Sequence, residues 1–128
     1  ERRSLNANAY CWKLCTEIAN VLTLQGSAVA KEDVYFKALK DYGQSDIVTI
    51  LSKVNAADYF KYYEVMGEGK IKDKDYTAYR VYKGSSEYDT REMSILLDGI
   101  IQDAEELGIH TITPNEAEAM KARWGVEV

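Results

Sequence analysis

The sequence predicts a helix-dominated α+β domain with a small antiparallel sheet. Amphipathic helical patterns occupy both ends of the chain, and short segments rich in β-branched and aromatic residues lie between them. At 128 residues the chain has the usual length of one domain, so we expect residues 1–128 to form one unit. No apolar run approaches the roughly 20 residues of a membrane span, and we expect a cytoplasmic protein.

The first helix is predicted over residues 6–23, where apolar side chains recur every three or four positions. Ser4 or Asn6 is expected to cap it, because either side chain can accept a hydrogen bond from a first-turn amide. Its apolar stripe contains Cys11, Leu14, Cys15, Ile18 and Leu22. Cysteines four residues apart on one helix are poorly placed for an unstrained disulfide, so we expect two buried thiols in a reducing compartment.

A second helix is predicted over residues 31–42, and Gly43 is expected to end it in the left-handed conformation. The β-branched run at 47–51 predicts a strand. A hairpin is predicted from 60–66 and 76–83, with its turn in the glycine-containing region Gly67-Glu68-Gly69 and the charged loop that follows.

The longest helix is predicted over residues 90–107. Asp89 and Glu92 form a capping-box pattern at its start, and Gly108 is expected to end it. Thr113-Pro114-Asn115-Glu116 then opens a final helix, with threonine as the cap and proline in the first turn.

The net charge of −5 argues against indiscriminate binding of polyanions. Any nucleic-acid site must therefore be a local basic stripe in an acidic protein. The chain has one histidine, His110, for which we identify no nucleophile or metal partner, and we expect no cofactor and no catalytic activity.

Tyrosine is over-used, with ten tyrosines against two phenylalanines. Six of them cluster around the predicted hairpin and alternate with Lys61, Arg80 and Lys83. These six are Tyr59, Tyr62, Tyr63, Tyr76, Tyr79 and Tyr82. Rings interleaved with cations suit sequence-tolerant binding of single strands. The alternative is a half-buried sheet, where tyrosine is favoured for packing.

A nuclease is the enzymatic alternative. Asp58 followed by Glu68-Gly69-Lys70 fits the loose carboxylate–lysine spacing of metal-dependent nucleases. The pattern is unspecific, and the predicted turn at these residues does not suit chemistry that needs a rigid strand. One histidine cannot supply both the metal ligand and the base of an HNH nuclease.

Three blocks of sequence occur in the order found in a known family. They are Arg3-Ser4-Leu5-Asn6-Ala7-Asn8, leading into a helix with Trp12; Gly84-Ser85-Ser86 through Asp89-Thr90-Arg91-Glu92-Met93 to Glu106-Leu107-Gly108-Ile109; and Lys121-Ala122-Arg123-Trp124-Gly125. Together the three blocks cover about half of the chain. By these blocks and their order, the chain resembles the NinB (Orf) phage recombination-mediator family. Ala7 stands where the family usually has glutamine, and residues 44–83 match poorly. The family's N-terminal strands are missing, so we expect a fragment with an incomplete sheet.

The resemblance implies a homodimer of mixed α/β protomers in the bacterial host cell. It implies binding of single-stranded DNA and of the host single-strand-binding protein, to help load a recombinase, without catalysis. A protein-interaction module without direct DNA contact is the alternative, and the acidic balance favours it.

The candidate DNA-binding residues are Arg2, Arg3, Asn8, Lys13, Lys61, Arg80, Tyr82, Lys83, Arg91, Lys121, Arg123 and Trp124. For the cations near the first helix, the alternative is a solvated helix start. For Lys121 and Arg123, it is a favourable interaction with the helix dipole. Trp12 could stack on a base or pack in the core.

Overall fold

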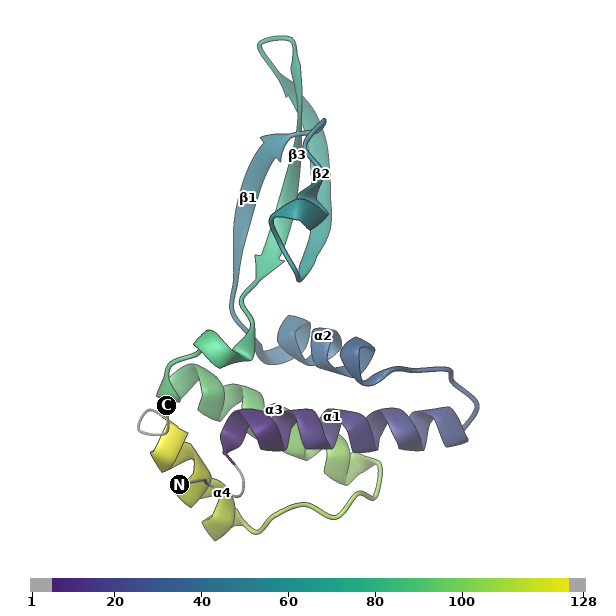
Figure 1. The fold of residues 1–128 in the computed structure, drawn as a ribbon, viewed down its shortest axis with the longest axis vertical. Helices are drawn as coiled ribbons and strands as arrows, with labels where there is room; N and C mark the ends of the chain where they lie inside the picture. Colours follow the sequence, from purple (N-terminus) through teal and green to yellow (C-terminus); the bar gives the residue numbers. More distant parts are fainter. Residues whose placement is uncertain (1–5, 125–128) are drawn as a thin grey trace.

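The computed structural model describes residues 6–124, except for the side chain of Trp124, and confirms the α+β fold class. Helices from both ends of the sequence pack together, and an antiparallel sheet projects from one side of them (Figure 1). We call the packed helices the helical body, and the sheet with residues 52–62 the stalk. Within the described residues, no helix is long and apolar enough to cross a membrane.

The helices of the body are α1 (Ala7–Leu24), α2 (Lys31–Tyr42), α3 (Thr90–Glu106) and α4 (Pro114–Trp124). Each matches its sequence prediction to within one or two residues, because local signals fix the ends. The side chain of Asn6 accepts a hydrogen bond from the Ala9 amide at 2.8 Å. The predicted capping box at α3 forms in both directions between Asp89 and Glu92.

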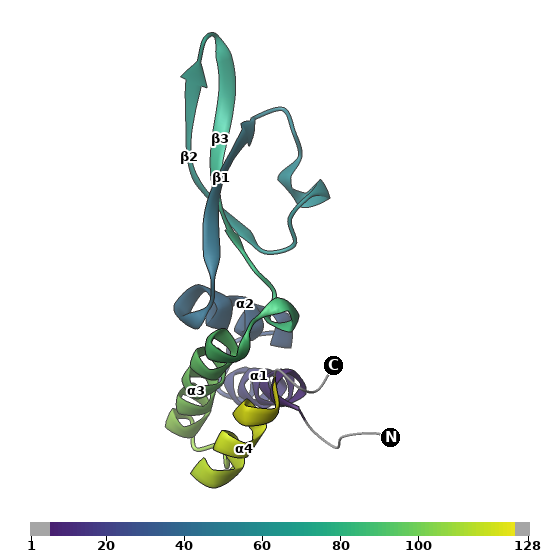
Figure 2. The ribbon, with the colours of Figure 1, turned by 90° about the vertical axis from the view of Figure 1, so that its left-hand side faces the viewer.

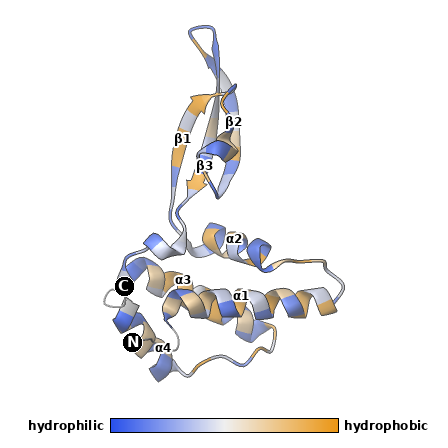
Figure 3. Cartoon of the chain, in the orientation of Figure 1, coloured by the Kyte–Doolittle hydropathy of each residue, from blue (hydrophilic) through white to orange (hydrophobic). Residues whose placement is uncertain are grey.

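The core of the body lies where α1, α2 and α3 meet. Its largest fully buried apolar side chains are Leu14, Leu39, Met93, Leu96, Leu97 and Ile100. Cys11 and Cys15 are buried as free thiols in the same cluster, as the helical spacing predicted. Hydrophobic residues run along α1 and α3, but they also reach β1 in the stalk (Figure 3).

The stalk sheet contains β1 (Ser45–Leu51), β2 (Tyr63–Ile71) and β3 (Lys74–Tyr82), in the order β1-β3-β2. The predicted hairpin is present, but its loop is much shorter than the predicted region of residues 67–75. The turn is Lys72-Asp73, whose φ angles of 49° and 71° match a two-residue turn that follows the twist of the strands. Gly67 and Gly69 instead lie inside β2. The register of the sheet shifts between Val65 and Gly67, and glycine accommodates such a β-bulge as readily as it does a turn.

One face of the sheet is covered by residues 52–62, which contain the short helix η1 (Ala56–Asp58) (Figure 2). The hydroxyls of Ser52 and Thr77 lie 2.7 Å apart, and Thr77 and Tyr79 are buried. On the opposite face Ile47, opposite Arg80 in the register, is 53% exposed. The stalk is therefore a thin layer with one open face.

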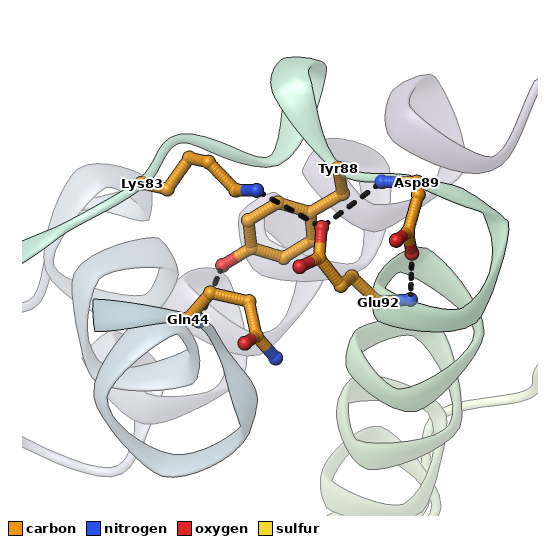
Figure 4. Close-up of polar contacts among 5 residues, drawn as sticks. All are labelled: Gln44, Lys83, Tyr88, Asp89 and Glu92. Atoms are coloured by element: carbon orange, nitrogen blue, oxygen red, sulfur yellow. Dashed lines mark hydrogen bonds and ion pairs between the residues drawn. The ribbon is translucent and has the colours of Figure 1, made fainter. Parts of the chain in front are cut away.

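The stalk joins the body through two chain crossings, after α2 and after β3. Gly43 has a φ of −95°, so the predicted left-handed conformation is wrong. The glycine is instead needed for space, because an added Cβ would collide with the Tyr88 hydroxyl. That hydroxyl accepts a hydrogen bond from the Gln44 amide at 3.1 Å (Figure 4). Beside it, Lys83 donates to the Glu92 carboxylate at 3.0 Å, which ties β3 to the start of α3.

Candidate nucleic-acid interface

A cleft of about 540 Å³ lies at the junction between the body and the stalk, and we call it the junction pocket. Its lining comes from α1, α2, the end of the 52–62 segment, the end of β3 and the following η2 (Ser85–Glu87). The lining residues are Asn8, Trp12, Tyr35, Tyr59, Phe60, Lys61, Tyr62, Val81, Tyr82, Lys83, Gly84, Ser86 and Glu87. The pocket therefore combines aromatic rings with two cations.

The aromatic wall of the pocket is packed and fixed. The rings of Trp12 and Tyr35 stack with centroids 4.0 Å apart and planes 17° from parallel. The ring of Tyr62 lies 5.5 Å from that of Tyr35 in a tilted arrangement. At the rim, Tyr59 is 72% exposed and adds a ring that is open to solvent. The pocket therefore offers a rigid aromatic wall and one accessible platform, which suits stacking of a flat ligand.

Hydrogen bonds hold this wall in place through Ser85, which is fully buried. The Ser85 amide donates to the Tyr35 hydroxyl at 2.8 Å, and the Ser85 hydroxyl donates to Asn8 Oδ1. Since the serine proton is used on Asn8, the Tyr35 hydroxyl donates to Ser85 Oγ at 2.6 Å. Burial raises the pKa of Tyr35, so its phenol stays protonated and able to donate. With its oxygen engaged, Asn8 keeps its amide N–H groups as donors beside the pocket.

The two cations of the pocket differ in their partners. Lys61 is exposed, its ammonium lies 5.5 Å from the Tyr62 ring centroid, and it makes no ion pair with a described residue. Lys83 pairs with Glu92 and lies 5.5 Å from the Tyr88 ring centroid. Glu87 also lines the pocket and opposes an anionic ligand. Lys61 is therefore available to pair with an anionic ligand, whereas the charge of Lys83 is partly neutralised by Glu92.

Four of the predicted DNA contacts meet at this pocket: Asn8, Lys61, Tyr82 and Lys83. Tyr82 is buried and its hydroxyl donates to Glu64 at 2.7 Å, so it forms part of the wall and not an open stacking surface. Arg80 lies farther along β3, where it donates to the Ser45 hydroxyl at 3.1 Å.

Two other predicted contacts lie elsewhere, in a shallow cleft between α3 and α4. Arg91 is exposed there, but the side chain of Lys121 is only 12% exposed. Its ammonium lies 2.9 Å from Asp98 and 3.0 Å from Glu118. Two carboxylates neutralise this lysine, so it is poorly available to a phosphate.

The remaining candidates are not gathered with either group. Lys13 is exposed on α1 and pairs with Glu17 in the next turn. Arg123 is exposed near the end of α4. The candidates that fall outside the described part of the chain are Arg2, Arg3 and the side chain of Trp124.

Sequence reasoning missed Tyr35 and Phe60 as parts of the site. Tyr35 also packs in the core, and its position in the pocket wall depends on how α1 meets α2, which a pattern within one helix does not reveal. The run from Tyr59 to Tyr62, with three aromatic residues around Lys61, was the available signal for the rim.

The nuclease pattern is not assembled into a metal site. Glu68 and Lys70 lie inside β2, so their predicted position in a turn is wrong, and Lys70 pairs with Asp75 at 2.8 Å. Asp58 lies in η1. Among residues 6–124 no three His, Cys, Asp or Glu side chains are grouped to hold a metal ion.

The acidic excess of the chain lies outside the stalk. Residues 45–83 contain seven Lys or Arg and six Asp or Glu, whereas the other described residues, 6–44 and 84–124, contain seven and thirteen. A polyanion is therefore repelled less by the stalk side of the molecule than by the helical body.

The chain matches no protein-family model, and no curated protein or solved structure matches it significantly. The resemblance to the NinB family therefore stays a hypothesis that rests on three blocks of sequence.

Proposed function

We propose that the chain binds single-stranded DNA by placing an unpaired base in the junction pocket. The observation that carries this proposal is the aromatic wall of Trp12 and Tyr62, which are half-buried and backed by the buried ring of Tyr35. Beside it lies Lys61, which forms no ion pair with a described residue. The pocket volume falls within the range of roughly 300–1,000 Å³ that is common for sites of small organic groups.

The chemistry of the pocket favours a single strand over a duplex. Every base has a flat π-face that can stack on tyrosine, but in a duplex these faces are hidden between neighbouring base pairs. Lys61 and Lys83 flank the rings, so each can form an ion pair with a phosphate next to a stacked base. Such a site discriminates little between bases, because stacking and phosphate contacts are common to all of them.

We further propose, from the NinB resemblance, that this binding serves phage recombination in the bacterial cytoplasm. In that setting the protein acts as a homodimer, engages the host single-strand-binding protein and helps load a recombinase. Sedimentation of the purified chain tests the dimer. A sedimentation coefficient that corresponds to a monomer at every concentration contradicts it.

Fluorescence anisotropy with labelled single-stranded and duplex oligonucleotides, over a salt series, tests DNA binding. Lys61→Ala is expected to weaken single-strand binding, whereas Lys31→Ala, an exposed lysine on the body, serves as the charge-matched control. Equal affinity for single-stranded and duplex DNA contradicts the proposal. Binding to the host single-strand-binding protein without binding to DNA favours the interaction-module alternative.

The stacking part of the proposal is tested at Tyr59, because an exposed ring is removed with little loss of stability. Stacking on an aromatic side chain is worth about 1–3 kcal/mol per base, so Tyr59→Ala is expected to weaken binding about 5- to 150-fold. Tyr59→Phe keeps the ring and is expected to bind like the unmodified protein. Equal affinities of the two variants would remove Tyr59 from the interface.

A further inference from the structure

The β2–β3 turn lies at the end of the stalk that points away from the helical body (Figure 1), and four lysines lie around it. Lys70, Lys72 and Lys74 surround the β2–β3 turn, and Lys53 lines a small cleft together with Lys74. We call Lys53, Lys70, Lys72 and Lys74 the stalk tip. All four are exposed, and only Lys70 forms an ion pair with a described residue, at 2.8 Å from Asp75.

The tight turn concentrates this charge. Lys72 and Asp73 form the whole loop, and Ile71 pairs directly with Lys74, so the strands bring the lysines together over a short distance. Asp73 and Asp75 offset part of the positive charge, which leaves an excess of two cations at the tip. Nearby like charges without partners repel one another, and an anionic ligand with several charges relieves this repulsion.

We infer that a single strand of DNA seated in the junction pocket continues along the stalk, and that the stalk tip binds its phosphates. This inference rests on the proposed single-strand binding and adds a second contact region to it. The tip supplies point charges without rings, so it holds the backbone and not the bases.

The length of β3 sets the number of nucleotides that such a strand must have. The β-strand β3 runs from Lys74 at the tip to Tyr82 at the pocket, a distance of about 27 Å at about 3.4 Å per residue. A strand with stacked bases, at about 3.4 Å per nucleotide, needs about eight nucleotides to cover that distance, and a stretched strand needs fewer. This length agrees with the roughly 4–16 nucleotides that a single-strand-binding domain usually covers.

The 52–62 segment joins the two regions on the covered side of the sheet. It begins with Lys53 at the tip and ends with Tyr59 and Lys61 at the pocket rim, and these three side chains are exposed. Its one acidic residue is Asp58. Cations at both ends and an open ring between them favour a nucleic acid over an acidic peptide, which has no bases to stack.

The test compares oligothymidylates of four and twelve nucleotides, which are shorter and longer than the predicted span. The tip variant combines Lys72→Asn with Lys74→Gln, because asparagine tolerates the positive φ of residue 72. The matched control, Lys31→Ala with Lys37→Ala, removes two exposed lysines of α2 in the helical body. Affinities are measured by fluorescence anisotropy over a salt series.

The tip variant is expected to bind the twelve-nucleotide strand about tenfold more weakly, with a slope of log affinity against log salt that is shallower by about 1.4 for two lost contacts. It is expected to bind the four-nucleotide strand as the unmodified protein does, which also shows that its pocket is folded. If the unmodified protein binds both strands and the tip variant matches it on both, the tip inference is wrong and the pocket proposal stands. If the unmodified protein binds neither strand, both proposals fail.

Discussion

Replacing Glu92 with glutamine is expected to strengthen single-strand binding. In the folded protein Glu92 holds Lys83 at 3.0 Å and also accepts a hydrogen bond from the Asp89 amide at the start of α3 (Figure 4). Glutamine keeps an oxygen that can accept from Asp89, so the helix cap is preserved. The substitution therefore removes the charge that competes with DNA for Lys83, without removing the structural contact.

The expected size of the effect follows from the exposure of the pair. The side chains of Lys83 and Glu92 are 38% and 20% exposed, so solvent screens their attraction. Pairs of this kind contribute about 0.2–1 kcal/mol, and releasing Lys83 is expected to raise the affinity about 1.4- to 5-fold. One additional phosphate contact steepens the slope of log affinity against log salt by about 0.7.

Anisotropy titrations with Glu92→Gln and Glu106→Gln separate a local effect from a global one. Glu106 is exposed at the other end of α3, and its substitution changes the net charge by the same amount. Only Glu92→Gln is expected to steepen the salt dependence. Equal changes in both variants would refute the idea that Glu92 restrains a DNA-binding lysine.

The remaining predictions concern the helical body. A Cβ added at Gly99 would lie about 2.5 Å from ring atoms of Tyr42. Gly99→Ala is therefore expected to lower the free energy of unfolding, measured in urea, by about 1–3 kcal/mol. An unchanged free energy of unfolding contradicts the close packing of α2 against α3. The hydrogen bond to Asp103 raises the pKa of Tyr42 to about 12, whereas an unfolded tyrosine titrates near pH 10. Its stabilising contribution is therefore complete below pH 10 and is lost as the pH rises to about 12, and Tyr42→Phe is expected to flatten this part of the stability–pH curve. Burial raises the pKa of Cys15 to about 12 and also raises the pKa of Cys11. Neither thiol is therefore expected to react with a disulfide reagent at pH 8 before the protein unfolds. Rapid reaction of the native protein contradicts the burial of these thiols.

The helices could be predicted from the sequence because their signals are local. The apolar stripe of α1 and the capping pair Asp89 and Glu92 need only neighbours within a few residues. The hairpin turn could be placed only within the broad loop of residues 67–75, because Lys72-Asp73 lacks glycine and two glycines lie nearby in the sequence. Glycine has several uses in a strand, and the sequence does not separate a bulge from a turn.

The candidate site could be predicted only in part. The alternation of rings and lysines from Tyr59 to Lys83 marked the stalk side of the junction pocket. The opposite wall depends on how α1 packs against α2 and η2, where Asn8 accepts a hydrogen bond from Ser85, 77 positions away. The neutralisation of Lys121 by Asp98, 23 residues distant, likewise depends on the packing of α4 against α3.

Tryptophan fluorescence gives the most direct test of whether a base enters the junction pocket. The chain contains two tryptophans, so Trp124→Phe leaves Trp12, in the pocket wall, as the one indole reporter. Titration of this variant with a twelve-nucleotide oligothymidylate is expected to quench the emission of Trp12 to saturation, and Tyr59→Ala in the same background is expected to shift the midpoint to higher concentration. An emission that stays constant while anisotropy reports full binding means that DNA lies elsewhere on the protein, and it contradicts the pocket as the site of base stacking.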